Sequence, residues 1–317
     1  MYVFELIGED DAFAAYEASC VVGSVDVIAT GIAAAIEAPE RVEHLAWTRT
    51  ICEEVCRTEP HQGAMVDGLA AVEFDREGSI AVRARGVRET SIDTERLERS
   101  LGGVLTDHGF SVNLDDPDHS LRVLVSDELA VLGWVCREPG GDVGRRRPID
   151  RPFFQPGSMS PRLARWIVNV AGTRPDSRVL DPMCGTGGLV LECARVGGSC
   201  CAMDIQHKMV RGTRENWRAI EPSQTPTVLL GDAGRLPFVE NAFDAVIFDA
   251  PYGRQSKIAG HDVVGRALEE AKRVAHAAVV VWDRPVATLA HEAGWSVDQT
   301  FQRHVHRSLT RHICHLS

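Results

Sequence analysis

Apolar and polar positions alternate in two different ways along the 317 residues of the chain. From residue 178 onward, short apolar runs are separated by amphipathic stretches with apolar side chains at helical spacing. This alternation predicts β-α-β units and a parallel sheet. The tail indicates two strands joined by a short turn, so we expect the sheet to end in an antiparallel hairpin. The expected strands are residues 179–180, 200–203, 228–230, 245–248, 278–282, 295–303 and 309–316.

Helices are expected between and before these strands. Gly197 and Gly198 end the first helix that follows the opening strand, as glycines commonly do. Pro285 opens a short helix near the tail. The other amphipathic stretches predict helices over residues 163–170, 189–194, 208–220 and 263–276.

The first half of the chain has a less regular pattern. Helical spacing occurs near residues 25–37, 42–57 and 94–108, interleaved with strand candidates at residues 69–74, 80–85, 120–125 and 129–135. These elements together predict a small α+β unit. Residues 138–148 are rich in Pro, Gly and Arg, which is typical of a linker. We therefore expect an N-terminal region over 1–137, a linker over 138–152 and a second domain over 153–317.

Charge separates the same two halves. Residues 1–150 carry 29 acidic and 14 basic side chains, whereas residues 151–317 carry 16 acidic and 20 basic ones. Of the 34 basic residues only three are lysines. An acid-rich, lysine-poor chain indicates either a salt-loving source or a GC-rich genome that encodes Arg for Lys. Composition does not separate these two origins.

No segment has the pattern of a membrane span or of a secretion signal. The apolar stretch around residues 31–36 is bounded by Asp26 and Glu37 and falls short of the roughly 20 residues that cross a bilayer. The first residues lack the basic region and cleavage pattern of a signal peptide. We expect a cytoplasmic protein that does not bind membranes.

Cysteine and histidine do not form a metal-binding pattern. The nine cysteines include no Cys-x-x-Cys pair, and most are expected as small core residues. Histidines alternate along the tail, but no carboxylate or cysteine at ligand spacing completes a site there. We expect no bound metal at this tail cluster, which consists of His304, His306, His312 and His315.

The first sharp chemical signal is residues 181–188, Asp-Pro-Met-Cys-Gly-Thr-Gly-Gly, between a strand and a helix. Glycines there let a ligand approach the backbone at the carboxyl end of a strand. A dinucleotide fingerprint needs a small residue three positions after Gly187, where this chain has Val190. A P-loop is excluded because no Gly-Lys-Ser/Thr follows. The acidic residue that opens the loop suits a ligand with a cationic amino-acid end.

Three carboxylates close the first three expected strands. Asp181 can accept from an ammonium group, Asp204 from two ribose hydroxyls and Asp232 from an adenine amino group. Solvated carboxylates at strand ends are common, but three in succession fit one ligand. Together they point to S-adenosylmethionine.

The fourth strand leads into Asp249, Ala250, Pro251 and Tyr252. This segment resembles the Asp/Asn-Pro-Pro-Tyr motif of amino-methyltransferases, which act on exocyclic nitrogens of adenine, cytosine or guanine. It departs from the motif at Ala250, which keeps the main-chain carbonyl that the family uses as an acceptor. The resemblance implies that Asp249 and that carbonyl hold the amino protons, while Tyr252 stacks on a base swung out of its helix. Pro251 would keep the turn rigid.

A closer resemblance rests on four segments: residues 151–159 (Arg-Pro-Phe-Phe-Gln-Pro-Gly-Ser-Met), the loop 181–188, residues 249–254 and residues 306–311. Together they resemble the archaeal tRNA guanine-10 N2-methyltransferases over the whole chain. That family combines an α/β class I (Rossmann-like) methyltransferase domain, with a seven-stranded sheet, and a preceding α+β THUMP-type RNA-binding domain with a ferredoxin-like piece. Residues 109–118 are the most similar stretch of the first half, where the match is looser. The implied activity is mono- or dimethylation of a guanine in tRNA.

The resemblance and the strand-end pattern together define the expected site. Residues 154–158 would lie over the methionine end of S-adenosylmethionine. The expected cofactor-binding residues are Phe154, Pro156, Gly157, Ser158, Asp181, Pro182, Cys184, Gly185, Thr186, Gly187, Asp204, Ile205, Asp232, Ala233 and Asp249. The expected RNA-binding residues are Arg145, Arg146, Arg147, Arg254, Lys257, Arg307 and Arg311.

Several alternatives stay open from sequence. The arginines at 145–147 could contact phosphate or keep a linker solvated. The motif at 249–252 alone also permits an enzyme that acts on another RNA site, on DNA or on a protein amide. A noncatalytic RNA-binding protein with an inactive pocket is a third reading. We expect tRNA as the partner and a monomeric chain.

Overall fold

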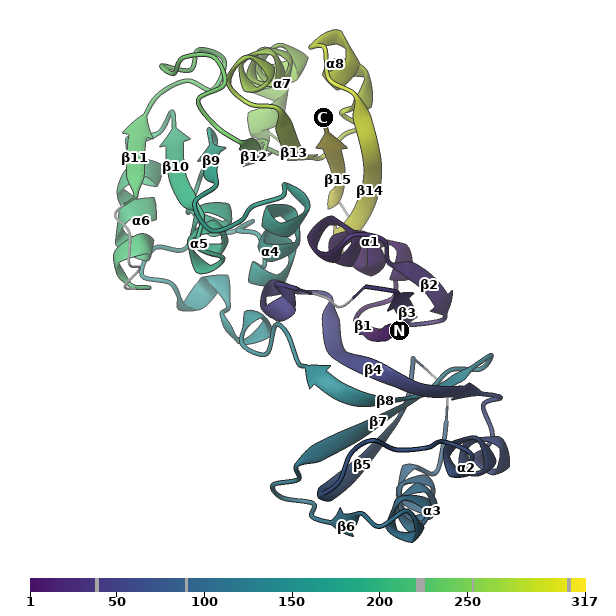
Figure 1. Ribbon diagram of the computed structural model, residues 1–317. Helices are drawn as coiled ribbons and strands as arrows, with labels where there is room; N and C mark the ends of the chain where they lie inside the picture. Colours follow the sequence, from purple (N-terminus) through teal and green to yellow (C-terminus); the bar gives the residue numbers. More distant parts are fainter. Residues whose placement is uncertain (38–39, 89–90, 221–225, 253, 307–308) are drawn as a thin grey trace. The chain divides into compact units, whose positions relative to one another are not determined.

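The computed structural model describes residues 1–37, 40–88, 91–220, 226–252, 254–306 and 309–317, with backbone alone at 254–261 and 306. The chain divides into two compact units, Met1–Gly141 and Asp142–Ser317, which are described separately (Figure 1). None of the described helices is both long and apolar enough to cross a bilayer.

The first unit is built on an eight-stranded sheet in the order β2-β3-β1-β4-β8-β7-β5-β6. Helix α1 packs on the apolar cluster around Phe4, whereas α2 and α3 pack on the cluster around Leu101 and Trp134. Its strands are β1 (Tyr2–Leu6), β2 (Asp26–Ala29), β3 (Ile32–Ala35), β4 (Thr48–Thr58), β5 (Ser79–Gly86), β6 (Ser111–Val112), β7 (His119–Val125) and β8 (Ala130–Arg137). Its helices are α1 (Asp11–Val22), η1 (Val42–His44), α2 (Gln62–Ala70) and α3 (Thr94–Asp107).

Three predictions for the first unit are wrong. Residues 25–37 form the β2–β3 hairpin, turned at Gly31 with a φ of 71°, and not a helix. Residues 42–57 form η1 and most of β4, because β4 pairs with both β1 and β8. Residues 69–74 are the end of α2 and the loop after it. In each case pairing in the sheet or packing of a helix outweighs local propensity, whereas α3, β5, β7 and β8 confirm the remaining predictions.

The second unit contains a seven-stranded sheet in the order β11-β10-β9-β12-β13-β15-β14, which confirms the predicted strand number. The strands β9 to β13 run parallel, and β15 and β14 form the predicted antiparallel hairpin. The strands are β9 (Arg178–Asp181), β10 (Ser199–Asp204), β11 (Thr227–Leu230), β12 (Ala245–Asp249), β13 (Ala277–Trp282), β14 (Val297–His306) and β15 (Leu309–Leu316). The helical elements are η2 (Val143–Arg145), η3 (Pro148–Asp150), α4 (Pro161–Val170), α5 (Gly188–Arg195), α6 (His207–Arg218), α7 (Arg254–Val274) and α8 (Ala287–Glu292).

The strand order places one crevice at the centre of the carboxyl edge. The chain leaves β9 toward β10 on one side and later returns to β12 on the other side. Loops that leave neighbouring strands in opposite directions open a ligand site at the switch point. Because β15 runs antiparallel to β13, with His312 opposite Trp282, it begins at this same edge.

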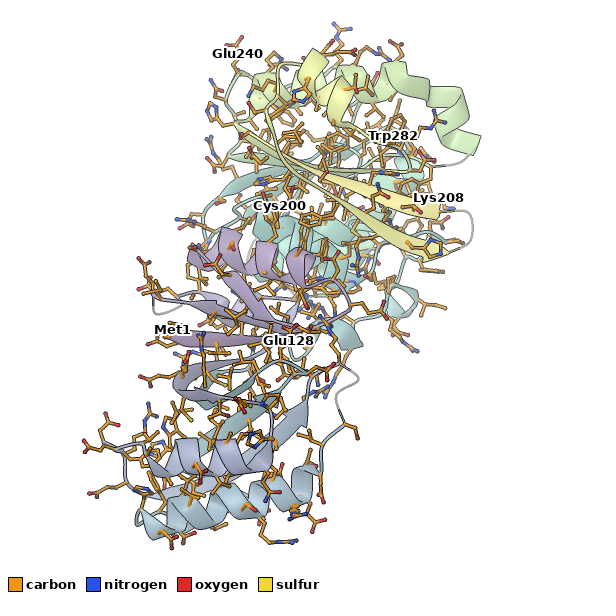
Figure 2. All side chains as sticks on the ribbon, turned by 90° about the vertical axis from the view of Figure 1, so that its right-hand side faces the viewer. Met1, Glu128, Cys200, Lys208, Glu240 and Trp282 are labelled. Carbon is orange, nitrogen blue, oxygen red and sulfur yellow. A yellow bond between two sulfur atoms is a disulfide. The ribbon has the colours of Figure 1, made fainter. Side chains whose placement is uncertain are left out.

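A buried tryptophan and a disulfide lie within the second unit. Trp282 is fully buried in the largest apolar cluster, between the sheet and α7 (Figure 2). Cys193 and Cys200 form a disulfide that joins the end of α5 to the start of β10, so these two cysteines are not the simple core thiols that we expected. Most of the other cysteines are buried or half-buried and free, as predicted.

Candidate active site

A cavity of about 450 Å³ opens at the carboxyl ends of β9, β10, β11 and β12. Its lining comes from the loops after these four strands, from the segment before α4 and from α5, α6 and α7. The structure brings together sixteen of the predicted residues there: Pro156, Gly157, Ser158, Asp181, Pro182, Cys184, Gly185, Thr186, Asp204, Ile205, Asp232, Ala233, Asp249, Ala250, Pro251 and Tyr252.

Two predicted cofactor residues do not line the cavity. Phe154 is 37% exposed and lies outside the lining. Gly187 is the N-cap of α5, with a φ of 81°, and a Cβ there would lie 2.9 Å from Thr213. Gln155, Met183 and Gly188 lie inside the predicted segments 154–158 and 181–188 and also line the cavity. Sequence reasoning missed Met159, Leu189, Gln206, Met209, Gly231, Val263 and Arg266. Most of these missed residues are next to a predicted residue in sequence. Met209, Val263 and Arg266 lie within helices, and no local sequence pattern marks them as site residues.

The glycine loop takes a shape that other residues rarely adopt. Gly185 and Gly187 have φ values of 51° and 81°, in the left-handed region. The loop is tied to the sheet because Cys184 donates its N–H to the Met203 carbonyl at 2.9 Å. Thr213 of α6 donates its hydroxyl to the Gly185 carbonyl at 2.9 Å. The loop is therefore held open toward the cavity from two sides.

The three strand-end carboxylates already accept backbone N–H groups. Asp181 accepts from Met183 at 3.1 Å. Asp204 accepts from Gly185 at 3.0 Å through one oxygen and from Gln206 at 2.9 Å through the other. Asp232, which is exposed, accepts from Gly234 at 2.9 Å. Each carboxylate is oriented locally, and a carboxylate oxygen keeps a second lone pair for a ligand.

The buried carboxylates make this part of the cavity favourable for a cationic ligand. Asp181 and Asp204 are 2% and 7% exposed. Burial raises the pKa of Asp181 well above its usual range, and the neighbouring Asp204 and Asp249 raise it further. Burial also raises the pKa of Asp204, against the backbone N–H groups that lower it. A cationic ligand that replaces the lost solvation would favour the ionised carboxylates.

Asn216, which sequence reasoning missed, fixes the segment before α4. This buried side chain of α6 accepts from the Phe153 N–H at 2.8 Å and donates to the Phe153 and Thr186 carbonyls at 2.8 and 2.9 Å. Ser158 and Thr186 lie in hydroxyl contact at 3.1 Å. Residues 153–158 are thereby joined to the glycine loop. No local pattern marks an Asn within a helix for this task.

The ring of Phe153 lies against α6 at Gly212. A Cβ at position 212 would lie 1.9 Å from that ring. The Lys208 ammonium lies 5.8 Å from the ring centroid on the same helix. Absence of a side chain at 212 therefore allows the segment before α4 to dock on α6.

The motif after β12 differs from the other strand ends. The Ala250 N–H continues the sheet by donating to the Val281 carbonyl at 2.8 Å. Asp249 Oδ1 is buried and has no hydrogen-bond partner among the residues that the structure describes. Burial raises the pKa of Asp249 to about 7, although the nearby Arg311 guanidinium lowers it. The motif thus presents a free acceptor next to the cavity.

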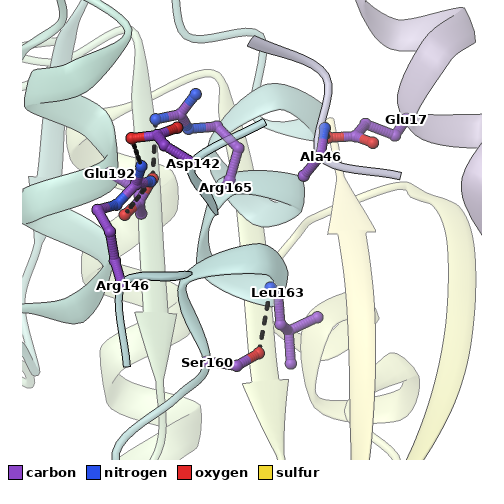
Figure 3. A network of polar contacts seen from close by, with 8 residues as sticks. All are labelled: Glu17, Ala46, Asp142, Arg146, Ser160, Leu163, Arg165 and Glu192. Atoms are coloured by element: carbon purple, nitrogen blue, oxygen red, sulfur yellow. Dashed lines mark hydrogen bonds and ion pairs between the residues drawn. The ribbon is translucent and has the colours of Figure 1, made fainter. Parts of the chain in front are cut away.

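The predicted RNA-binding arginines have very different surroundings. Arg145 is exposed, and Arg147 is exposed and paired with Asp150 at 2.9 Å. Arg146 instead donates to both oxygens of the buried Glu192, at 2.9 and 2.7 Å, and Arg165 pairs with the same carboxylate at 2.8 Å (Figure 3). This cluster gives Arg146 a structural task and leaves phosphate binding by it without structural support. The side chains of Arg254, Lys257 and Arg307 lie outside the described residues.

Arg311 is buried, only 5% exposed, and makes its contacts inside the unit. Its guanidinium lies 3.7 Å from Asp249 Oδ2 and 3.2 Å from the Tyr252 hydroxyl. A surface role in binding phosphate has no support from this position.

Two family models match the chain. Residues 148–313 match the RMKL-like methyltransferase domain, and residues 64–135 match the THUMP domain. A tRNA (guanine(10)-N2)-dimethyltransferase of Methanothermobacter thermautotrophicus is 35% identical over 247 residues, 74% of this chain and 72% of that protein. A tRNA (guanine(6)-N2)-methyltransferase of Thermus thermophilus is 32% identical over 57% of this chain and 53% of its own length.

Solved structures share the fold. TrmN from Thermus thermophilus superposes with a TM-score of 0.54 at 22% identity, over 100% of this chain and 99% of that one. SMU.472, a methyltransferase complexed with SAH, superposes with a TM-score of 0.51 at 13% identity, over 99% of this chain and 97% of that one.

Proposed function

The chain belongs to the RMKL-like methyltransferases, and on that basis we propose that it transfers a methyl group from S-adenosylmethionine to N2 of a guanine in tRNA. The observation that carries the proposal is the buried Oδ1 of Asp249 at the edge of the cavity, which has no hydrogen-bond partner among the described residues. A buried acceptor without a partner is costly unless a ligand donates to it. An exocyclic amino group supplies that donor.

The relatives narrow the substrate. The names of the two relatives described above specify N2 of guanine in tRNA, at position 10 or position 6, and a THUMP domain accompanies the catalytic domain here. We propose guanine-10 as the target, with one or two methyl groups added, because a dimethyltransferase acting at that position is 35% identical over 74% of this chain.

The cavity fits S-adenosylmethionine. Its volume of about 450 Å³ suits a ligand of this size. The glycines at 185 and 187 allow close approach, and Asp181 and Asp204 would hold the ammonium group and the ribose hydroxyls. The bound cofactor supplies a methyl group on a sulfonium. Both of its cationic groups would offset the burial of the carboxylates.

The chain's own residues would orient the base and receive its protons. Asp249 Oδ1 and the Ala250 carbonyl would each accept a hydrogen bond from one amino N–H and hold the nitrogen in line with the methyl group. Tyr252 would stack on the flipped guanine. The amino nitrogen is a poor nucleophile because its lone pair is delocalised, so orientation rather than strong basicity lowers the barrier. The amino proton becomes acidic once the methyl group arrives, and Asp249 could then accept it.

RNA binding would be shared between the two units. We propose residues 1–137 as the RNA-binding region, 138–152 as a linker and 153–317 as the catalytic domain of a monomeric, cytoplasmic enzyme. The exposed Arg145 and Arg147 would neutralise phosphates, together with Arg254, Lys257 and Arg307. Reversing the charge of Arg145 and Arg147 should weaken tRNA binding and flatten its salt dependence.

The test is methylation of unmodified tRNA transcripts with labelled S-adenosylmethionine, followed by mass spectrometry of the nucleosides. We expect N2-methylguanosine or N2,N2-dimethylguanosine, lost when guanine-10 is replaced and kept when guanine-6 is replaced. The reverse dependence would move the site to position 6. Label in DNA but not in RNA, or cofactor binding without any transfer, would overturn the proposal.

A further inference from the structure

The direction of β15 places the buried Arg311 next to the motif at 249–252. In the sheet His312 lies opposite Trp282, and Asp249 of β12 lies opposite Val281. Arg311 precedes His312, so it lies at the carboxyl edge where β12 ends. Its neighbours Thr310 and His312 are half-buried, whereas Arg311 is almost fully buried. Burying an arginine is costly unless its donors find partners.

Arg311 contacts two segments that lie far apart in sequence, the motif at 249–252 and the segment at Gly157. Its Nε donates to the Tyr252 hydroxyl at 3.2 Å, and its Nη2 donates to the Gly157 carbonyl at 3.1 Å. The same Nη2 lies 3.7 Å from Asp249 Oδ2. The guanidinium carbon is 5.6 Å from the centroid of the Tyr252 ring. One side chain therefore joins the catalytic motif to the segment over the cofactor.

The two oxygens of the Asp249 carboxylate have different surroundings. Oδ2 faces the guanidinium, whereas Oδ1 is buried and finds no partner in the described part of the chain. A charge on one oxygen fixes the rotation of the carboxylate and leaves the other oxygen for a donor from the substrate. The hydrogen bond to the Tyr252 hydroxyl likewise restrains the ring that would stack on the base.

We propose that Arg311 is a positioning residue for methyl transfer: it holds the Asp249 carboxylate and the Tyr252 ring in register with each other and with the cofactor-side segment at Gly157. This rests on the proposed function, since it names how that site is held in its active geometry. A lysine has the charge but lacks the planar fork that reaches several partners at once.

The charge of Arg311 also bears on the ionisation of Asp249. Burial raises the pKa of Asp249 to about 7, and the guanidinium acts in the opposite direction. Among the described residues, the other groups near this carboxylate are Asp181 of β9, whose own pKa is raised in part by Asp249, and the Tyr252 hydroxyl. Removal of the guanidinium should therefore raise the pKa of Asp249 further.

The experiment compares Arg311→Gln and Arg311→Lys with the wild type in single-turnover assays across pH, with saturating S-adenosylmethionine. The matched control is Arg303→Gln, because Arg303 lies opposite Arg311 in the β14–β15 hairpin. We expect Arg311→Gln to lower the rate constant by roughly a hundredfold, as loss of a preorganised polar group does. The midpoint of its pH profile should move upward. Arg311→Lys should restore the midpoint but recover little of the rate, and Arg303→Gln should leave both unchanged.

A double variant separates positioning from loss of structure. In an Asp249→Asn background position 249 no longer titrates, so Arg311→Gln should not shift the midpoint of the pH profile and should lower the rate constant less than it does in the wild type. The proposal would be overturned if the two substitutions lowered the rate constant additively. It would also be overturned if a folded Arg311→Gln protein kept the wild-type midpoint of the pH profile. Thermal unfolding and S-adenosylmethionine affinity identify a variant that has only lost its fold. If the wild type itself transfers no methyl group to tRNA, it is the proposed function that fails.

Discussion

The cavity has two walls that are built by different means. The cofactor wall consists of Asp181, Asp204 and Asp232, and each of these carboxylates accepts an N–H from a residue within two positions or from the adjoining loop. The catalytic wall consists of Asp249 and Tyr252 with Arg311 against them, and its contacts join residues 59 and 154 positions apart. If the proposed roles hold, cofactor binding is encoded locally, whereas catalysis depends on segments that meet only in the folded chain.

Mutations in the two walls should therefore affect different steps, cofactor binding in one case and methyl transfer in the other. A substitution in the cofactor wall removes an oriented acceptor and should weaken binding of the cofactor. A substitution in the catalytic wall should leave cofactor binding intact and slow the transfer of the methyl group. The predictions below test this separation.

The largest effect is expected at Asp249. Asp249→Ala should lower the single-turnover rate constant by on the order of a hundredfold or more, because a preorganised acceptor is lost. Asp249→Asn should keep measurable activity, since an amide oxygen accepts in the same place. S-adenosylmethionine should bind both variants as it binds the wild type. Equal inactivity of the two folded variants would mean that the charge or basicity of the carboxylate matters and that the orientation account fails.

A smaller effect is expected at Asp204, in the other wall. Asp204→Ala removes charge-assisted hydrogen bonds worth roughly 1.5–3 kcal/mol, which corresponds to a rise of about tenfold to a hundredfold in the dissociation constant of S-adenosylmethionine. Calorimetry measures this constant, and tRNA affinity should stay unchanged. Thermal unfolding is the control, because Asp204 also accepts from the Gly185 and Gln206 N–H groups. An equal fall in tRNA affinity would make Asp204 a structural residue.

Cofactor binding should release protons. The pKa values of Asp181 and Asp204 are raised by burial, and a cationic ligand favours their ionised forms. Affinity for S-adenosylmethionine should therefore increase as pH rises, and less so for the neutral sulfur of S-adenosylhomocysteine. Titrations in buffers of different ionisation enthalpy count the protons. Equal proton release by the two ligands would show that the sulfonium does not interact with these carboxylates.

The smallest effect concerns stability. The folded-state pKa of Asp249, about 7, lies above its ordinary value of 3.8, so the folded protein holds this proton more tightly than the unfolded chain does. That stabilisation is complete below pH 3.8 and is lost as pH rises through 7. An amide does not titrate, so the Tm of Asp249→Asn relative to the wild type should increase over this window, by a few degrees at most. A constant difference in Tm across pH would argue against a raised pKa.

Sequence predicted the second unit well because its signals are local. The parallel strands β9 to β12 are short apolar runs, each with a carboxylate at its end or within two residues after it, and the residues that follow line the cavity. The first unit was predicted less well because β3 and β4 depend on their partners. Residues 33–35 are all alanine, a good helix former, yet they are buried as a strand between β1 and β2.

The same distinction applies to the site. The loops at 181–188 and 249–252 carry their chemistry in consecutive residues, so they could be found. Asn216 and Arg311 could not be placed, because their partners lie 63 and 154 residues away. Arg311 was assigned to phosphate as one of several tail arginines. Only the antiparallel direction of β15 brings it to the catalytic edge.

The contact between Phe153 and Gly212 constrains the order in which this protein can change over evolution. Any side chain at 212 would overlap the ring of Phe153, whose nearest atom is 1.9 Å from the position of a Cβ. The glycine cannot be replaced first without displacing the segment that leads into the cavity. A smaller residue at 153 has to come first, and such an intermediate leaves a void on α6. Among relatives, we therefore expect the two positions to vary together, with the aromatic ring lost before the glycine is.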